Sequence, residues 1–128
     1  MGAETFADMK GKRMIQINVW RPLVDVVRRS PLSFCDASSI DPKDLIPAKI
    51  HFPDTKHFGE IYALRKSAGQ RWLYFSEMTH DEVVLIKGYD SLTEDVARFT
   101  PHTAFEYPDQ DPNIGPRKSI ETRTFAFY

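Results

Sequence analysis

What this sequence lacks excludes several classes of protein. It has a single cysteine, Cys35, which cannot form an internal disulfide, so a reducing compartment fits it best. No apolar run approaches the roughly 20 residues needed to span a bilayer. Residues 1–12 lack the apolar stretch of a secretory signal. These absences predict a cytoplasmic protein with no membrane partner.

An excess of charge of one sign is also missing. Seventeen basic residues face eighteen acidic ones, and the net charge is −1. The sequence shows no basic stripe with interleaved aromatic residues, which is the electrostatic footprint of a nucleic-acid-binding protein. We therefore expect no nucleic-acid partner, and nothing supports an acidic or membrane-surface partner.

The patterns that are present predict a mainly β protein. The 128 residues suffice for one domain with a core. Residues 13–20 alternate as a strand, with Ile17 and Val19 on one face and Asn18 and Trp20 on the other. The face that carries Asn18 and Trp20 has two interpretations, the wall of a cavity or the solvent side of an edge strand. Ahead of this strand, residues 3–9 predict a short helix that Gly11 ends.

The middle of the chain predicts loops and short strands. Residues 23–53 carry four further prolines and several Ser and Asp turn formers, which indicates loop and short edge segments. Residues 60–65 and 70–77 predict a hairpin with its turn at 66–69. Residues 83–86 are β-branched and short, so we expect a turn and a buried strand there rather than a helix.

The end of the chain has the most recognisable chemistry. Histidine is a common metal ligand, and His102 lies in Thr-Pro-His-Thr-Ala-Phe. Fifteen residues later, Arg117 and Ser119 open a predicted strand and share one face, so both point at the same object. An arginine beside a hydroxyl can hold a carboxylate in a bidentate grip. On spacing alone, a structural histidine and a surface arginine are the favoured explanation of these residues.

A histidine followed after a loop by Arg-x-Ser resembles the end of a jelly-roll iron(II)/2-oxoglutarate oxygenase. Further stretches resemble one family, the fungal hydroxylases and desaturases similar to gibberellin desaturase and often labelled as related to the cephamycin methoxylase accessory chain. These stretches are residues 18–23, 31–36, 71–75, 78–79, 81–83, 87–91, 102–105 and 116–123. The resemblance runs from about Gly11 to the C-terminus.

That resemblance implies both a fold and a function. The fold is the C-terminal part of a double-stranded β-helix, or jelly roll. The function is that of an oxidoreductase of secondary metabolism, an iron(II)- and 2-oxoglutarate-dependent hydroxylase or desaturase with a small-molecule substrate. In this family His102 would be the last iron ligand, and Arg117, helped by Ser119, would hold the distal carboxylate of 2-oxoglutarate. Hydroxylation and desaturation both stay open, as does the identity of the substrate.

The same resemblance predicts an incomplete site. The family's His-x-Asp ligand pair should precede the strand that begins at Arg13, and these residues do not contain it. We therefore expect residues 1–128 to form a single, truncated jelly-roll domain that does not hold iron or 2-oxoglutarate tightly alone, and we assign no catalytic residue. The alternative is a remnant of the fold that binds a ligand or partner without turnover. Unpaired strand edges predict homodimers.

Two other candidate sites are weaker. His80-Asp81-Glu82 has the His-x-Glu form of two iron ligands, but it lies in a predicted turn, and the family commonly has a proline in place of His80. We interpret it as a decoy. Cys35 has no histidine signature around it, so we expect a small buried residue rather than a nucleophile.

Overall fold

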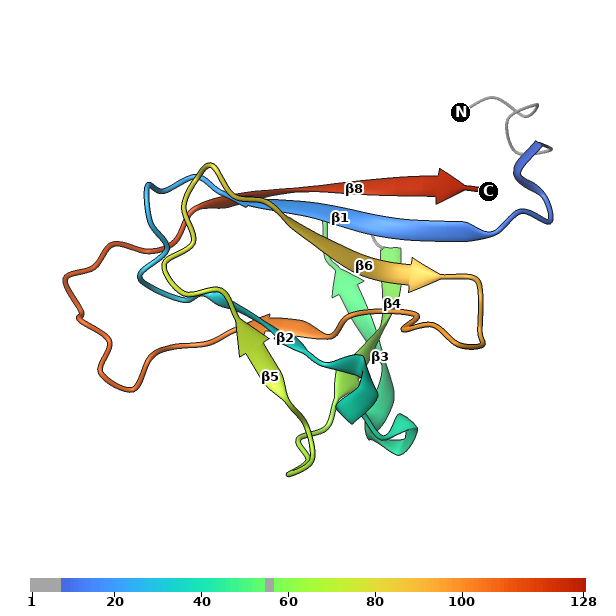
Figure 1. The fold of residues 1–128 in the computed structure, drawn as a ribbon, viewed down its shortest axis with the longest axis horizontal. Helices are drawn as coiled ribbons and strands as arrows, with labels where there is room; N and C mark the ends of the chain where they lie inside the picture. Colours follow the sequence, from blue (N-terminus) through green and yellow to red (C-terminus); the bar gives the residue numbers. More distant parts are fainter. Residues whose placement is uncertain (1–7, 55–56) are drawn as a thin grey trace.

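The computed structural model describes residues 8–54 and 57–128, and in this part of the chain two three-stranded antiparallel sheets face each other (Figure 1). The first sheet has the order β6-β1-β8 and the second the order β5-β2-β7. The strands of the first sheet are β1 (Met14–Pro22), β6 (Val84–Asp90) and β8 (Ser119–Phe127); those of the second are β2 (Leu32–Cys35), β5 (Trp72–Tyr74) and β7 (His102–Ala104). Two 3-10 turns, Ala37–Ser39 and Pro42–Asp44, follow β2. The prediction of a mainly β protein is confirmed.

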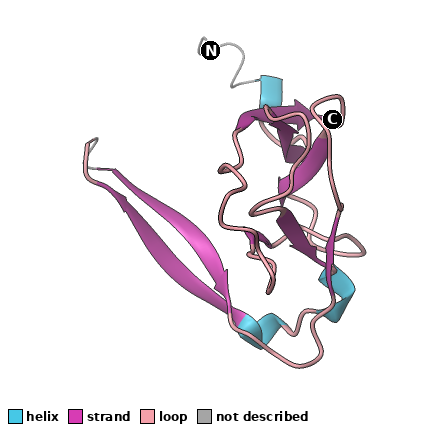
Figure 2. Cartoon of the chain, turned by 90° about the vertical axis from the view of Figure 1, so that its left-hand side faces the viewer, coloured by secondary structure: helices cyan, strands magenta, loops and turns pink. Residues whose placement is uncertain are grey.

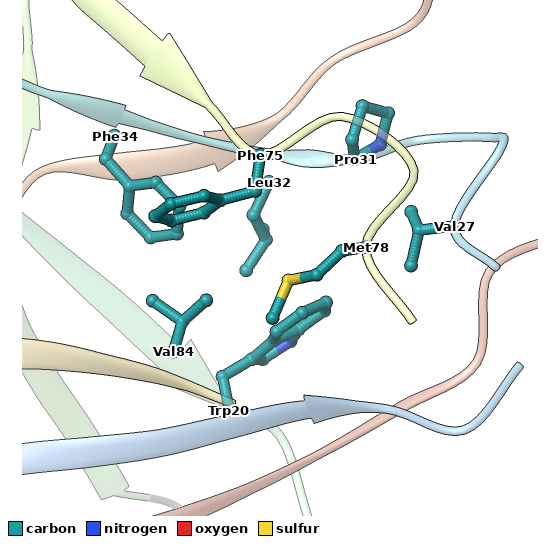
Figure 3. A pocket seen from close by; sticks show the side chains of 8 residues that line it. All are labelled: Trp20, Val27, Pro31, Leu32, Phe34, Phe75, Met78 and Val84. Atoms are coloured by element: carbon teal, nitrogen blue, oxygen red, sulfur yellow. The ribbon is translucent and has the colours of Figure 1, made fainter. Parts of the chain in front are cut away.

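Strand β1 is the centre of the first sheet, and its alternation decides which face is buried. Asn18 and Trp20 are only 5% and 3% exposed, while Ile17 and Val19 are half-buried. Figure 3 shows the Trp20 side chain directed from β1 toward the second sheet. Asn18 and Trp20 therefore face the interior, and the solvent-side interpretation of this face is wrong.

The core lies between the two sheets. Trp20, Val27, Met78 and Ile86 form its buried cluster, and Phe34 packs against them from the second sheet. The cavity that remains between Trp20 and Phe34 has a volume of about 10 Å³ and is lined mostly by apolar side chains (Figure 3). Such a volume is at the lower limit for one water molecule, so the core itself has no room for an organic ligand.

A buried carboxylate fixes one end of the first sheet. Asp90, the last residue of β6, is fully buried. The guanidinium of Arg13 donates to both of its oxygens, at 3.0 and 2.7 Å. Lys87 Nζ donates at 3.2 Å and the backbone N–H of Leu92 at 3.0 Å. The hydrogen bond from Arg13, helped by those from Leu92 and Lys87, holds the pKa of Asp90 well below its usual value.

The remaining two strands form a hairpin that the sequence did not predict. β3 (Leu45–Phe52) and β4 (His57–Leu64) pair antiparallel and project from the rest of the protein (Figure 2). The prediction of loop and short edge segments for residues 23–53 therefore missed the length of β3, which has eight residues, and its pairing with β4. The predicted hairpin of residues 60–65 with 70–77 is also wrong, because β4 pairs with β3 and β5 pairs with β2. Alternation marks a strand, but it does not select its partner.

The start of the described chain bears on the predicted N-terminal helix. Asp8 and Met9 are helical, and Gly11, with a φ of 82°, follows them in the left-handed conformation that ends a helix. The rest of the predicted helix lies outside the described residues. Among the described residues, no helix is long and apolar enough to cross a membrane.

Candidate functional site

Arg117 lies two residues before β8 and combines burial with the lack of an anionic partner. Its guanidinium carbon lies 5.2 Å from the centre of the Trp20 ring, so the side chain points to the inner face of the first sheet. Its Nη1 atom is buried and has no hydrogen-bond partner in the described part of the chain. Desolvation by burial lowers its pKa, yet an arginine stays charged at neutral pH. A half-buried cation with a buried N–H group that is unpaired in the described residues is a candidate site for an anion.

Ser119 is the first residue of β8 and is half-buried beside Pro22 of β1. Two residues further along β8, Glu121 pairs with Trp20, which identifies the inner face of the strand. Because side chains two apart share a face, Ser119 also lies on the inner side. The predicted placement of Arg117 and Ser119 on one face therefore agrees with the register of β8.

Glu121 is the carboxylate on this face that could have neutralised Arg117. Instead its Oε1 accepts a hydrogen bond of 2.6 Å from Nδ2 of the buried Asn18. Gln16 Nε2 in turn donates to Asn18 Oδ1 at 3.2 Å. Gln16, Asn18 and Glu121 thus hydrogen-bond to one another, and the guanidinium of Arg117 contacts the ring of Trp20 instead.

His102 lies on the other sheet, as the first residue of β7, and pairs with Phe34 of β2. The side chain is exposed, and its ring centre is 6.4 Å from that of Phe34. The ring Nδ1 lies 2.8 Å from the carbonyl oxygen of Thr100. Since a carbonyl can only accept, this contact assigns the proton to Nδ1 and leaves the lone pair of Nε2 free. A histidine that binds a metal is held in this way by a carbonyl partner.

The structure relates the two predicted site residues through the core. Arg117 stacks on Trp20, His102 lies beside Phe34, and Trp20 and Phe34 face each other across the small cavity (Figure 3). Arg117 and His102 thus each contact an aromatic residue that lines this cavity, Arg117 on the first sheet and His102 on the second.

The described residues supply only part of an iron site. A 2-His-1-carboxylate site needs three ligands on one metal. Within residues 8–54 and 57–128, no group of three His, Cys, Asp or Glu side chains could hold a metal ion. His102 is one imidazole of such a set. The described residues therefore fit a carboxylate at Arg117, but His102 alone does not make an iron site.

The other candidate ligand stretch, His80-Asp81-Glu82, makes its contacts within a turn. His80 lies at an exposed turn, and its Nε2 is 3.3 Å from Asp81 Oδ1. Glu82 accepts hydrogen bonds from the backbone N–H and the hydroxyl of Thr79. These contacts close the turn before β6, as the sequence predicted. Cys35 is buried, at 2% exposure, which confirms its interpretation as a small core residue.

A larger hollow nearby is not lined by Arg117. An open groove of about 590 Å³ runs between residues 24–28 and 114–118, and both Pro116 and Lys118 line it. Arg117 does not line it, although it lies between these two residues in the sequence. The guanidinium points to the sheet interior, and the groove lies on the other side of the backbone.

Comparisons with known proteins agree with this two-sheet arrangement. The model of the oxidoreductase/YMDC permease-like domain matches residues 1–127, so the chain belongs to that family. It is 39% identical over 126 residues to hydroxylase/desaturase asaB of Aspergillus flavus, covering 88% of this chain and 54% of the relative. It is 27% identical over 128 residues to the gibberellin cluster GA4 desaturase of Gibberella fujikuroi, covering 93% of this chain and 36% of the relative.

A solved structure gives the corresponding fold. The chain matches the iron and alpha-ketoglutarate-dependent endoperoxidase NvfI with a TM-score of 0.83 and 34% identity, over 98% of this chain and 45% of that one. The prediction of a jelly-roll fold and the resemblance to fungal hydroxylases and desaturases are both confirmed. The chain spans about half the length of asaB and NvfI and about a third of the GA4 desaturase.

Sequence reasoning missed two residues of this site. Trp20 was left between a cavity wall and the solvent side of an edge strand, and its contact with Arg117 joins positions 97 residues apart. The hydrogen bond of Glu121 to Asn18 was not predicted either. The alternation of β1 could have suggested both contacts, had the pairing of β1 with β8 been known.

Proposed function

We propose that this chain forms the carboxylate-binding half of an iron(II)- and 2-oxoglutarate-dependent hydroxylase or desaturase domain of secondary metabolism. The observation that carries the proposal is the half-buried guanidinium of Arg117, whose Nη1 has no partner in the described part of the chain and which lies at the start of β8. The relatives named hydroxylase/desaturase support the reaction class, and NvfI supports the cofactors.

In this proposal each residue has a limited task. Arg117 binds the distal carboxylate of 2-oxoglutarate, and Ser119 donates its hydroxyl to the same group. His102 presents Nε2 to iron while Thr100 holds its Nδ1 proton. When bound, iron(II) and 2-oxoglutarate would supply the activation of dioxygen for cleavage of a substrate C–H bond, and the oxoacid would be converted to succinate and carbon dioxide. The apolar side chains around Trp20 and Phe34 keep bulk water from the inner end of the site.

The further metal ligands are proposed to come from outside the described residues. In the second sheet β7 pairs only with β2 within the described part of the chain, so the outer edge of the strand that carries His102 is open. A strand added at that edge would bring its side chains beside His102. The relatives are about twice the length of this chain or longer, which allows for such a strand.

Calorimetric titration with 2-oxoglutarate, on a protein in which this chain is restored to the full length of its relatives, tests the carboxylate grip. Arg117→Ala should weaken binding by about 2 kcal/mol or more, because a charge-assisted hydrogen bond is lost. Lys118→Ala removes the same charge from the neighbouring exposed position and serves as the matched control; it should bind nearly as the unaltered chain does. Equal affinity of the unaltered and Arg117→Ala chains would refute the assignment.

A turnover assay separates an enzyme from a remnant that only binds. The chain is given iron(II), ascorbate and 2-oxoglutarate without oxygen, the visible charge-transfer band is recorded, and succinate is measured after oxygen is admitted. Because only His102 is available among the described residues, we expect neither the band nor succinate above a no-protein control. Both signals together would mean that these 128 residues hold a complete metal site, and His80-Asp81-Glu82 would be examined first.

A further inference from the structure

We propose that Trp20 is a positioning residue for Arg117, which its indole ring holds in the orientation that receives the distal carboxylate of a 2-oxoacid. This inference rests on the proposed function and extends it to a residue on a different strand. The contact that carries it is the guanidinium carbon of Arg117 lying 5.2 Å from the centre of the Trp20 ring.

The ring is a fixed platform. Trp20 is only 3% exposed and belongs to the buried cluster with Val27, Met78 and Ile86. Packing on this scale holds a side chain in one rotamer. Figure 3 shows the indole between Met78 and β1, with Val84 beside it. A group that stacks on this ring is therefore located by the core of the protein.

Stacking and carboxylate binding use different parts of the guanidinium. The flat face of a guanidinium lies on an aromatic ring, while its N–H groups point outward from its edge in the geometry that matches a carboxylate. In this structure the buried Nη1 has no partner in the described residues. Trp20 can thus orient Arg117 without occupying the donors that a ligand needs.

The neighbouring acid does not compete for the guanidinium. Glu121 lies opposite Trp20 on the same face of the sheet, but Asn18 holds its Oε1 at 2.6 Å. Asn18 and Trp20 are two residues apart on β1, and both side chains are buried. The inner face of β1 therefore supplies the Trp20 ring for the Arg117 guanidinium and, separately, the Asn18 amide as a hydrogen-bond donor for the Glu121 carboxylate.

Two 2-oxoacids separate positioning from general packing. 2-Oxoglutarate has a distal carboxylate and 2-oxobutanoate does not, while their 2-oxoacid ends are the same. Dissociation constants for both are measured by NMR titration of the 128-residue chain and of its Trp20→Leu, Trp20→Phe and Arg117→Ala variants. Trp72→Leu, at the exposed tryptophan of β5, is the matched control.

Trp20→Leu should weaken 2-oxoglutarate binding about tenfold, since a desolvated cation–π contact is lost, and should leave 2-oxobutanoate unchanged. Trp20→Phe should keep most of the affinity, because a ring remains. In the Arg117→Ala background, Trp20→Leu should cause no further loss. Equal weakening of both acids, or a loss that persists without Arg117, would mean that Trp20 acts only through packing and would overturn the proposal.

A measurement without ligand covers the case in which Trp20→Leu does not fold. The ring current of Trp20 should displace the Nε–Hε resonance of Arg117, and Trp20→Phe should reduce that displacement with the fold retained. An unchanged resonance in Trp20→Phe would contradict the stacking. If Arg117→Ala binds 2-oxoglutarate normally, the proposed function fails; if it loses binding while both Trp20 variants keep it, only the present inference fails.

Discussion

Two charged residues, Asp90 and Arg117, occupy the ends of the strands that flank β1, and their surroundings differ. Asp90 ends β6 with Arg13, Lys87 and the backbone of Leu92 around its carboxylate. Arg117 precedes β8 with an aromatic ring on its face and a buried Nη1 that has no partner in the described residues. In our proposal, Asp90, which is satisfied within the chain, holds the fold together, and Arg117, whose Nη1 is unsatisfied in the described residues, binds a ligand.

Substitution by leucine at Arg13 and at Arg117 should give the largest difference in stability between the two regions. Arg13→Leu removes the bidentate partner of a fully buried carboxylate, so it should lower the melting temperature much more than Arg117→Leu does. Arg117→Leu should leave the free energy of unfolding within about 1 kcal/mol of the unaltered chain, because the lost cation–π contact is offset by relief of an unsatisfied donor. Thermal unfolding followed by circular dichroism measures both. A larger loss for Arg117→Leu would reverse the assignment of the two roles.

Lowering the pH should destabilise the protein through the carboxylates that are hydrogen-bonded in the fold, Asp36 and Asp90. Arg71 and Ser38 lower the pKa of Asp36 from 3.8 to about 2, and Arg13 lowers that of Asp90 in the same direction. Because the folded-state pKa is depressed, the stability they contribute is present above about pH 4 and is lost as the pH falls toward 2. Melting temperatures recorded from pH 5 to pH 2 should therefore decrease, and Asp90→Asn should reduce the slope. An identical slope in that variant would exclude Asp90 as a source of the acid sensitivity.

Much of the fold was accessible from the sequence because it depends on local alternation. The strand at residues 13–20 followed from the period of two, as did the common face of Arg117 and Ser119, but which face of that strand is buried did not. The hairpin of β3 with β4 was missed because Pro47 and its neighbours have loop composition, and β5 was given the wrong partner. Strand pairing and the stack of Arg117 on Trp20 depend on contacts between distant residues, which local patterns do not specify.

The weakest effect that we predict is self-association. Within the described residues β8 pairs only with β1 and β7 only with β2, so each leaves an open edge on its sheet. Open edges recruit other strands, and we expect concentration-dependent dimers. Light scattering over a range of protein concentrations measures this. A monomer at every concentration would show that these edges are protected.

Titration of the chain with 2-oxoglutarate, followed by the Nε–Hε resonances of its arginines, tests the central claim most directly. Arg117 is the unsatisfied cation and Arg13 the satisfied one, so each serves as the control for the other. Our account predicts that the Arg117 resonance moves with 2-oxoglutarate concentration while that of Arg13 stays in place. If Arg117 does not respond, or if both arginines respond equally, Arg117 is not the carboxylate site.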